Sequence, residues 1–504
     1  MGDFLAPLLR GLMLAFQSGM VGGAAFAVLV APLGGKLAKA DTLKWAGLAA
    51  LGTAAMALAS LWALIANLMS NLDLSFGEAI GADFVRHLGL VAAAALVTAF
   101  FCLPCAARRM PWLAAMAAMA AVAFSVAGGH GASRVEGRLP LMAADFVHQM
   151  AAGLWLGGIP FLLAALARAP GGRGRIALCR RFSAMAMVAV AVLALSAVAL
   201  AIVHVGSWQA MIGTDFGAMA LVKMALLGIL LLLGLGNFRA GPCLDQPAPL
   251  RRLRAFAVAE LGIGLAVLMI AASLSAQPPP AATPEQVAAP ADMLSRLLPE
   301  RWPRFTAPMP TQPGSPEDRA WAEMTHHWAG LVVLAMGILA LLRPLPGFRW
   351  ARHWPLLFLA IALGIPLLSD PDSWPLGPYG FWGKPGDVEV PQHRLAALLV
   401  AAFALIEWAV QTGKLRRLGP ALVFPASCGL GGLLLLTHGH PNSQGVDALL
   451  IHLSHMTIAI LGLIAGAGRW IELAADEAAR PLAARLWPTA FALVGVVLLV
   501  YREG

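Results

Sequence analysis

Long apolar segments follow one another along the whole chain, separated by short polar or charged loops. Most run for about 17–25 residues, the length of helix that crosses the hydrocarbon core of a bilayer. Their residues do not alternate in polarity at every second position, which excludes a transmembrane β-barrel. The fold class predicted is therefore all-α, a polytopic transmembrane helical bundle. About fourteen spans are expected, near residues 9–32, 44–67, 87–107, 110–128, 143–166, 184–205, 217–237, 254–275, 326–342, 354–369, 394–411, 419–437, 447–467 and 485–501.

Composition and charge support a membrane protein. The chain is 60% hydrophobic and 12% charged, whereas soluble domains are about a quarter charged. Basic residues gather in the loops after the odd-numbered spans, for example Lys36 and Lys39 after the first and Arg108 and Arg109 after the third. By the positive-inside rule these loops are cytoplasmic and both termini are periplasmic. The net charge of +9 thus reports topology and does not indicate a nucleic-acid partner.

A proline-rich stretch at Gln277–Pro316 divides eight predicted spans from six. It predicts an N-terminal eight-helix bundle over residues 1–275, a stiff periplasmic linker over 276–325 and a C-terminal six-helix bundle over 326–504. A short amphipathic helix is expected in the linker, around Ala291–Leu298. The external segment Asp370–His393, rich in proline, glycine and aromatic residues, is expected to pack as a lid at the membrane interface.

Histidines mark the candidate chemistry. On the predicted topology eleven of the twelve fall at or near the periplasmic side, and His353 falls inside. Neutral imidazole is a common transition-metal ligand, so clustered histidines at facing helix ends predict a metal site. One set is His130 and His148, with Asp145 on the same helical face as His148, where it could orient the ring or bind the metal. The other set lies within residues 437–456 and comprises His438, His440, His452 and His455.

The two sets form a short internal repeat. Seventeen residues separate His438 from His455, eighteen separate His130 from His148, and His452 occupies the place of Asp145. The two sets could form separate sites, one in each bundle, or combine into one. Isolated histidines such as His87 could equally be interfacial residues without a ligand.

Copper is the favoured ion. Histidine with carboxylate suits Cu(II), zinc or nickel, and methionine favours copper, Cu(I) in particular. Weaker candidate ligands are Met20, Met142, Met150 and Met456, although methionine in an apolar helix more often fills space. Cys102 and Cys105 form a CxxC at the inner end of the third span, which would suit release of Cu(I) or have no metal role.

Three charged residues fall within predicted spans: Lys223, Glu260 and Glu407. They could form a proton or ion relay, or the two glutamates could pair with nearby arginines and serve structure. Asn237 and Gln17 are expected to hydrogen-bond between helices. The sequence contains no P-loop, Rossmann glycine motif or nucleophile elbow, so neither ATP-driven transport nor an enzyme is predicted.

Residues 120–280 resemble the CopD family of bacterial copper-resistance membrane proteins. The resemblance rests on GGHG with His130, on DFVHQMAAGLWLGGIPFLL with His148, and on RRLRAFAVAELGIGLAVLMIAASLSAQPPP with Glu260. The second bundle is similar to the C-terminal part of longer members, with His326 in MTHHWAGL and His438, His440 and His455 at matching positions. His452 and HGHP depart from the commoner pattern of that part.

The resemblance implies copper transport across the bacterial inner membrane towards the cytoplasm, beside a periplasmic copper-binding protein of the CopC type. The chain shows no β-rich module of that kind, so this partner would be a separate chain. An alternative is a membrane-bound copper receptor or metallochaperone that binds or hands over copper without translocation. A haem or copper oxidoreductase is less favoured, because haem ligation on both membrane sides would need more inner histidines than His353.

Overall fold

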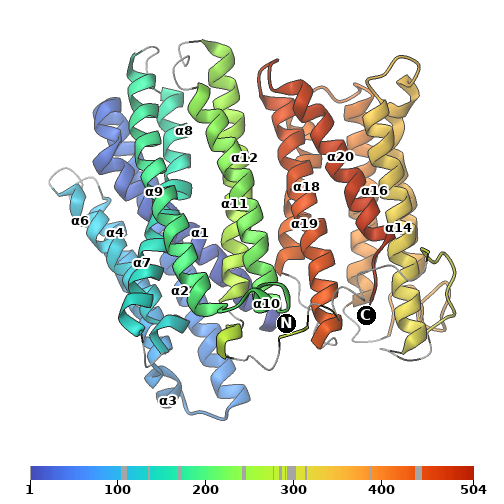
Figure 1. Cartoon of the computed structure of the whole chain (residues 1–504), viewed down its shortest axis with the longest axis horizontal. Coiled ribbons are helices and arrows are strands. Elements are labelled where there is room, and N and C mark those ends of the chain that lie inside the picture. Colours follow the sequence, from blue (N-terminus) through green and yellow to red (C-terminus); the bar gives the residue numbers. More distant parts are fainter. Residues whose placement is uncertain are drawn as a thin grey trace. The chain divides into compact units, whose positions relative to one another are not determined.

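The structure is a computed structural model. It describes residues 2–103, 110–133, 137–168, 173–240, 246–275, 277, 279–282, 287–289, 291, 302–310, 312, 315–384, 389–437 and 445–503. In these ranges every regular element is helical, apart from one isolated bridge between Ser373 and Tyr379 (Figure 1). The predicted all-α class is confirmed.

Each predicted span corresponds to an apolar helical segment of the described chain. Thirteen are long and apolar enough to cross a membrane, and a fourteenth, α6 (Pro111–Ala127), is apolar but shorter. Several helices begin before or end after the predicted apolar runs, because polar residues at their ends continue the same backbone hydrogen bonding. The helix α2, for example, spans Gly35–Asn71, whereas its apolar core was placed at 44–67.

The chain divides into two compact units, Met1–Val287 and Ala288–Gly504. In the first unit α1 (Gly2–Leu29) is central and contacts helices on several sides, among them α2, α6, α7 and α12. The helices of this unit, blue to green in Figure 1, are α1, α2, α3 (Phe76–Gly81), α4 (Asp83–Phe101), α6, α7 (Arg138–Trp155), α8 (Ile159–Arg168), α9 (Arg173–His204), α10 (Trp208–Ile212), α11 (Asp215–Ala240) and α12 (Pro247–Leu274).

The fifth predicted span is interrupted. A 3-10 segment, η3 (Leu156–Gly158), separates α7 from α8, and α1 lies against this break. A Cβ atom on Gly157 would lie 1.8 Å from the carbonyl oxygen of Ser18, so glycine alone permits this backbone contact. Close approach at small residues is a usual way for membrane helices to pack. The contact fixes α7 beside α1.

The second unit, yellow to red in Figure 1, contains α14 (Pro316–Leu342), η7 (Arg349–Leu357), α15 (Phe358–Leu368), α16 (Glu389–Gln411), α17 (Leu418–Ala421), α18 (Val423–Thr437), α19 (Gly445–Ala474) and α20 (Arg480–Leu499). Its core is aromatic: Trp354, Phe424, Trp487 and Phe491 form edge-to-face and tilted contacts.

The stretch between the two bundles is shorter than predicted. Ser315 caps α14 by accepting a hydrogen bond from the Asp318 amide (3.1 Å), so the helix begins well before residue 326. Residues 292–298, where the short amphipathic helix was expected, lie outside the described residues.

The segment 370–384 packs on the first turns of α16 through Arg394. This side chain is 2% exposed, and its guanidinium donates to the carbonyls of Pro366, Trp374 and Phe381 at 3.0–3.1 Å. Asp370 pairs with Arg394 (3.2 Å) and with His393 (2.7 Å). One buried arginine therefore orders the backbone of the expected lid.

Candidate functional site

The first unit contains a partly open cavity of about 1980 Å³ lined by residues of α1, α2, α4, α6, α7, α9, α11 and α12. Most lining side chains are apolar. Polar groups that line it include Arg10, Asp145, His148, Gln149 and Lys223. A large apolar pocket with a few polar groups is the usual form of a ligand site.

The His148 ring is oriented from another helix. Its Nδ1 lies 3.1 Å from Ser196 Oγ on α9, and the Ser196 hydroxyl donates to the carbonyl of Val192 (2.8 Å) or Leu193 (3.0 Å). Since the hydroxyl proton is used, Oγ accepts from Nδ1–H. This tautomer leaves the Nε2 lone pair for a ligand, which is how metal-binding histidines are commonly fixed.

Asp145 belongs to a hydrogen-bond chain between α1 and α7. Gln149 donates to Asp145 Oδ1 (3.2 Å), and Gln17 donates to Gln149 Oε1 (3.3 Å). The hydrogen bond predicted for Gln17 is thus confirmed. Asp145 does not supply the Nδ1 partner of His148, which is Ser196. Its second oxygen remains a candidate metal ligand.

Two cations share the cavity with Asp145. The Arg10 guanidinium donates to Ser125 Oγ (3.3 Å), and both Arg10 and Lys223 interact electrostatically with Asp145. Lys223 is also within electrostatic range of the His148 imidazole. Among the described residues, no carboxylate oxygen lies within 4.0 Å of either cationic group. Asp145 therefore attracts both basic side chains across the cavity but forms a direct ion pair with neither.

Several predicted ligands are not assembled. The His130 side chain and residues His438, His440 and Cys105 lie outside what is described. Met20 and Met456 are buried in helix packing, and Met142 and Met150 do not line the cavity, whereas Met211 and Met224 do. Cys102 is buried, with its Cβ close to Gly47 of α2. No group of three or more His, Cys, Asp or Glu side chains within the described ranges is arranged to hold a metal.

The second unit brings two predicted histidines to one aromatic ring. His326 stacks on Tyr501 (centroids 4.0 Å apart) and His455 meets the same ring edge-on (6.0 Å). Each Nδ1 is hydrogen-bonded to a carbonyl one turn earlier, Ala322 (2.7 Å) for His326 and Ile451 (2.8 Å) for His455. Burial and the neighbouring Glu503 raise the pKa of Tyr501, so its phenol stays neutral. His452 is half-buried on the same helix as His455.

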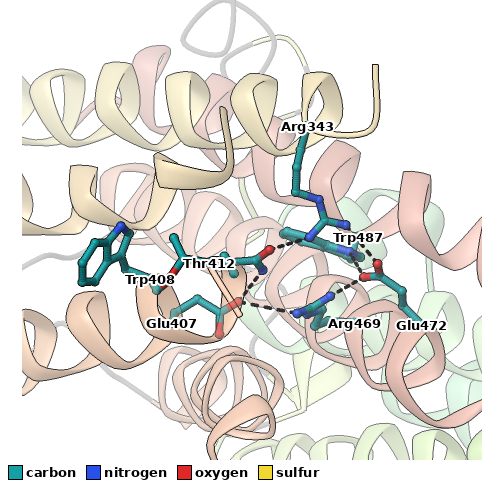
Figure 2. A network of polar contacts seen from close by, with 8 residues as sticks. Arg343, Glu407, Trp408, Thr412, Arg469, Glu472 and Trp487 are labelled. Atoms are coloured by element: carbon teal, nitrogen blue, oxygen red, sulfur yellow. Dashed lines mark hydrogen bonds and ion pairs between the residues drawn. The ribbon is translucent and has the colours of Figure 1, made fainter. Parts of the chain in front are cut away.

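The buried charges of the second unit form a closed network (Figure 2). Glu472 accepts from Arg343 (3.1 Å), Arg469 (2.6 Å) and the Trp487 indole (2.7 Å). Glu407 lies 3.7 Å from Arg469 and accepts from Gln411 (2.6 Å). Two arginines thus face two glutamates, and their charges cancel, as the structural alternative for Glu407 requires.

Glu260 has a different partner from the one expected. Asn237 of α11 donates to its Oε1 (2.5 Å) and Trp155 donates to the same carboxylate, so no arginine is needed to satisfy it. The bond between α11 and α12 confirms the cross-helix role predicted for Asn237.

Sequence reasoning overlooked three participants: Arg10, Gln149 and Ser196. An arginine inside the first predicted span was a readable signal, since buried charges in a membrane are costly. Nothing in the sequence links Ser196 to His148, because the two residues lie 48 positions apart on different helices.

Comparison with known proteins bears on the same region. Residues 176–274 match the family described as Copper resistance protein D, CopD. We refer to this matched stretch as the CopD region. The chain is also 33% identical over 161 residues to a protein named copper transport protein CutJ from Bacillus subtilis (strain 168), an alignment that covers 31% of this chain and 29% of that protein. No solved structure matches the chain.

The CopD region runs from the first turns of α9 to the end of α12. It contains Ser196, Lys223, Asn237 and Glu260, and residues of its helices α9, α11 and α12, Lys223 among them, line the cavity. Asp145 and His148 precede the CopD region in the chain, and in the folded protein they line the same cavity as its helices.

Proposed function

We propose that this protein carries copper across the bacterial inner membrane, from the periplasm towards the cytoplasm, through the cavity of the first unit. The observation that carries the proposal is that the CopD region holds His148 through Ser196, with Nε2 left for a ligand at a cavity it also lines. The relative CutJ is named a copper transport protein.

Copper here is the cargo. Imidazole Nε2 of His148 and the carboxylate of Asp145 are donors that suit copper, as Cu(I) or Cu(II). The periplasmic histidines of the C-terminal bundle, His326, His438, His440, His452 and His455, would capture the ion, with His130 near the entrance of the first unit.

The topology that goes with this function has both termini in the periplasm. The bundles 1–275 and 326–504 would be joined by a periplasmic linker over 276–325. A periplasmic copper-binding protein of the CopC type, as a separate chain, would deliver the metal. The protein is proposed to act as a carrier and not as an enzyme.

Radioactive copper uptake into proteoliposomes tests this function. His148→Ala should slow uptake at least about tenfold, because ligand shells of metal sites commonly contribute 10–100-fold. His353→Ala is the matched control, since that imidazole accepts from the Trp408 indole (2.8 Å) in the other unit. Stoichiometric copper binding without uptake would instead favour a receptor or metallochaperone, and Soret absorption of the purified protein would favour an oxidoreductase.

A further inference from the structure

The charge of the first-unit cavity does not favour a bare metal cation. Among the described residues, three cationic side chains line it (Arg10, Arg138 and Lys223) against two acidic ones (Asp83 and Asp145), which leaves a net charge of +1 with neutral histidines. Arg138 and Asp83 are exposed and of opposite sign. The excess positive charge therefore belongs to the inner group of Arg10, Lys223 and Asp145.

This excess charge has little compensation from the protein. Arginine stays protonated in proteins, and Lys223 adds a second basic group within electrostatic range of the Asp145 carboxylate. Yet neither cation has a carboxylate within 4.0 Å in the described part of the chain. Charges removed from water normally gain a direct partner, because Coulomb interactions strengthen as the dielectric constant falls. The buried arginines of the second unit do have such partners.

The volume of the cavity leaves room for an ion that carries its own ligands. Small-molecule sites usually measure about 300–1,000 Å³, and this cavity measures about 1980 Å³. It accommodates a metal ion together with its own ligands and water.

We propose that the cavity contains an anion site formed by Arg10 and Lys223, and that copper enters it with anionic ligands, as a complex of net charge −1 such as dichlorocuprate(I). Such a complex balances the net charge of the lining, and His148 Nε2 can replace one of its ligands. The copper part rests on the proposed function; the anion site does not.

Thiocyanate is a suitable metal-free probe, because it is a monovalent anion whose nitrile stretch reports transfer out of water. Infrared titration of the purified full chain should show saturable binding. Lys223→Met should weaken binding at least tenfold, and Lys223→Arg, which keeps the charge, should restore it. Wild-type protein without saturable binding would overturn the anion site, as would equal affinity in a folded Lys223→Met variant.

Copper uptake into proteoliposomes tests the form of the cargo. Cu(I) is supplied either as dichlorocuprate or, in chloride-free sulfate buffer, as the cationic acetonitrile complex. Wild-type protein should take up the anionic form at least tenfold faster, and Lys223→Met should remove that preference.

Equal uptake of both forms by wild-type and Lys223→Met protein would overturn the anionic cargo and leave copper transport standing. Uptake of neither form by wild-type protein would overturn the proposed transport, while the thiocyanate titration would still decide the anion site.

Discussion

Charged side chains within the helices form ion pairs in the second unit and line a cavity without ion pairs in the first. In the second unit, Arg343, Arg469, Glu407 and Glu472 form direct ion pairs at 2.6–3.7 Å and balance one another (Figure 2). In the first unit, Arg10, Lys223 and Asp145 line a cavity, carry a net positive charge and form no ion pair with any described residue within 4.0 Å. A charge inside a membrane helix is thus a poor guide to function until its partners are known. A closed, balanced set stabilises the bundle, whereas an open, unbalanced set is available to a ligand.

The largest effect should come from breaking the closed set. Arg469→Met leaves Glu407 and Glu472 without their shared cation in a buried site, which should cost about 3–5 kcal/mol of stability. The thermal unfolding midpoint in detergent measures this loss. Arg416→Met, at an exposed arginine, is the control and should change little. An unchanged midpoint for Arg469→Met would show that the network does not stabilise the unit.

Among the cavity charges Arg10, Lys223 and Asp145, the substitution Asp145→Asn should weaken metal binding without weakening anion binding. The variant loses a candidate copper ligand, and copper affinity should fall on the order of 100-fold. Thiocyanate affinity should not fall, since the lining becomes more positive. Equilibrium copper titration against a competing chelator, beside infrared titration, measures both. Asp83→Asn at the exposed edge of the cavity is the control, and a parallel loss of both affinities in Asp145→Asn would indicate general damage to the site.

A smaller effect is expected from the residue that orients His148. Ser196→Ala removes the acceptor of Nδ1–H, and copper affinity should fall roughly tenfold, the lower end of the range for such supporting residues. Ser60→Ala, at another serine that lines the cavity, serves as the control. Equal copper affinities for the two variants would mean that the hydrogen bond does not prepare His148 for metal.

The smallest effect sharpens the comparison between the units. Lys223→Met should leave stability unchanged or raise it by up to about 1 kcal/mol, because a half-buried basic group without an ion pair among the described residues is replaced by an apolar side chain of similar length. Unfolding midpoints measured beside Arg469→Met test this. A loss as large as that of Arg469→Met would place Lys223 in a structural network like that of the second unit.

The sequence predicted the helices well and the site partly. Membrane spans can be predicted from sequence because each must supply a long apolar run. The ends of the helices are harder to predict, because polar caps such as Ser315 start a helix before that run begins. The three-residue spacing predicted one helical face for Asp145 and His148, and both residues line one cavity, while their role as metal ligands stays a prediction. The partners that define their roles, Ser196 and Arg10, come from other helices. Local spacing carries no information about such contacts, since they depend on how the helices pack.

The break at η3 has a mechanical consequence. His148 lies about two turns before it along α7, roughly 12 Å at 1.5 Å per residue. Because Gly157 contacts the backbone of α1 at this break, the angle at which α7 leaves the contact sets the position of the imidazole. A tilt of about 10° there would move His148 by about 2 Å, the length of a metal–nitrogen bond. The angle set at this glycine contact would therefore decide whether the His148 imidazole reaches an ion bound at the proposed site.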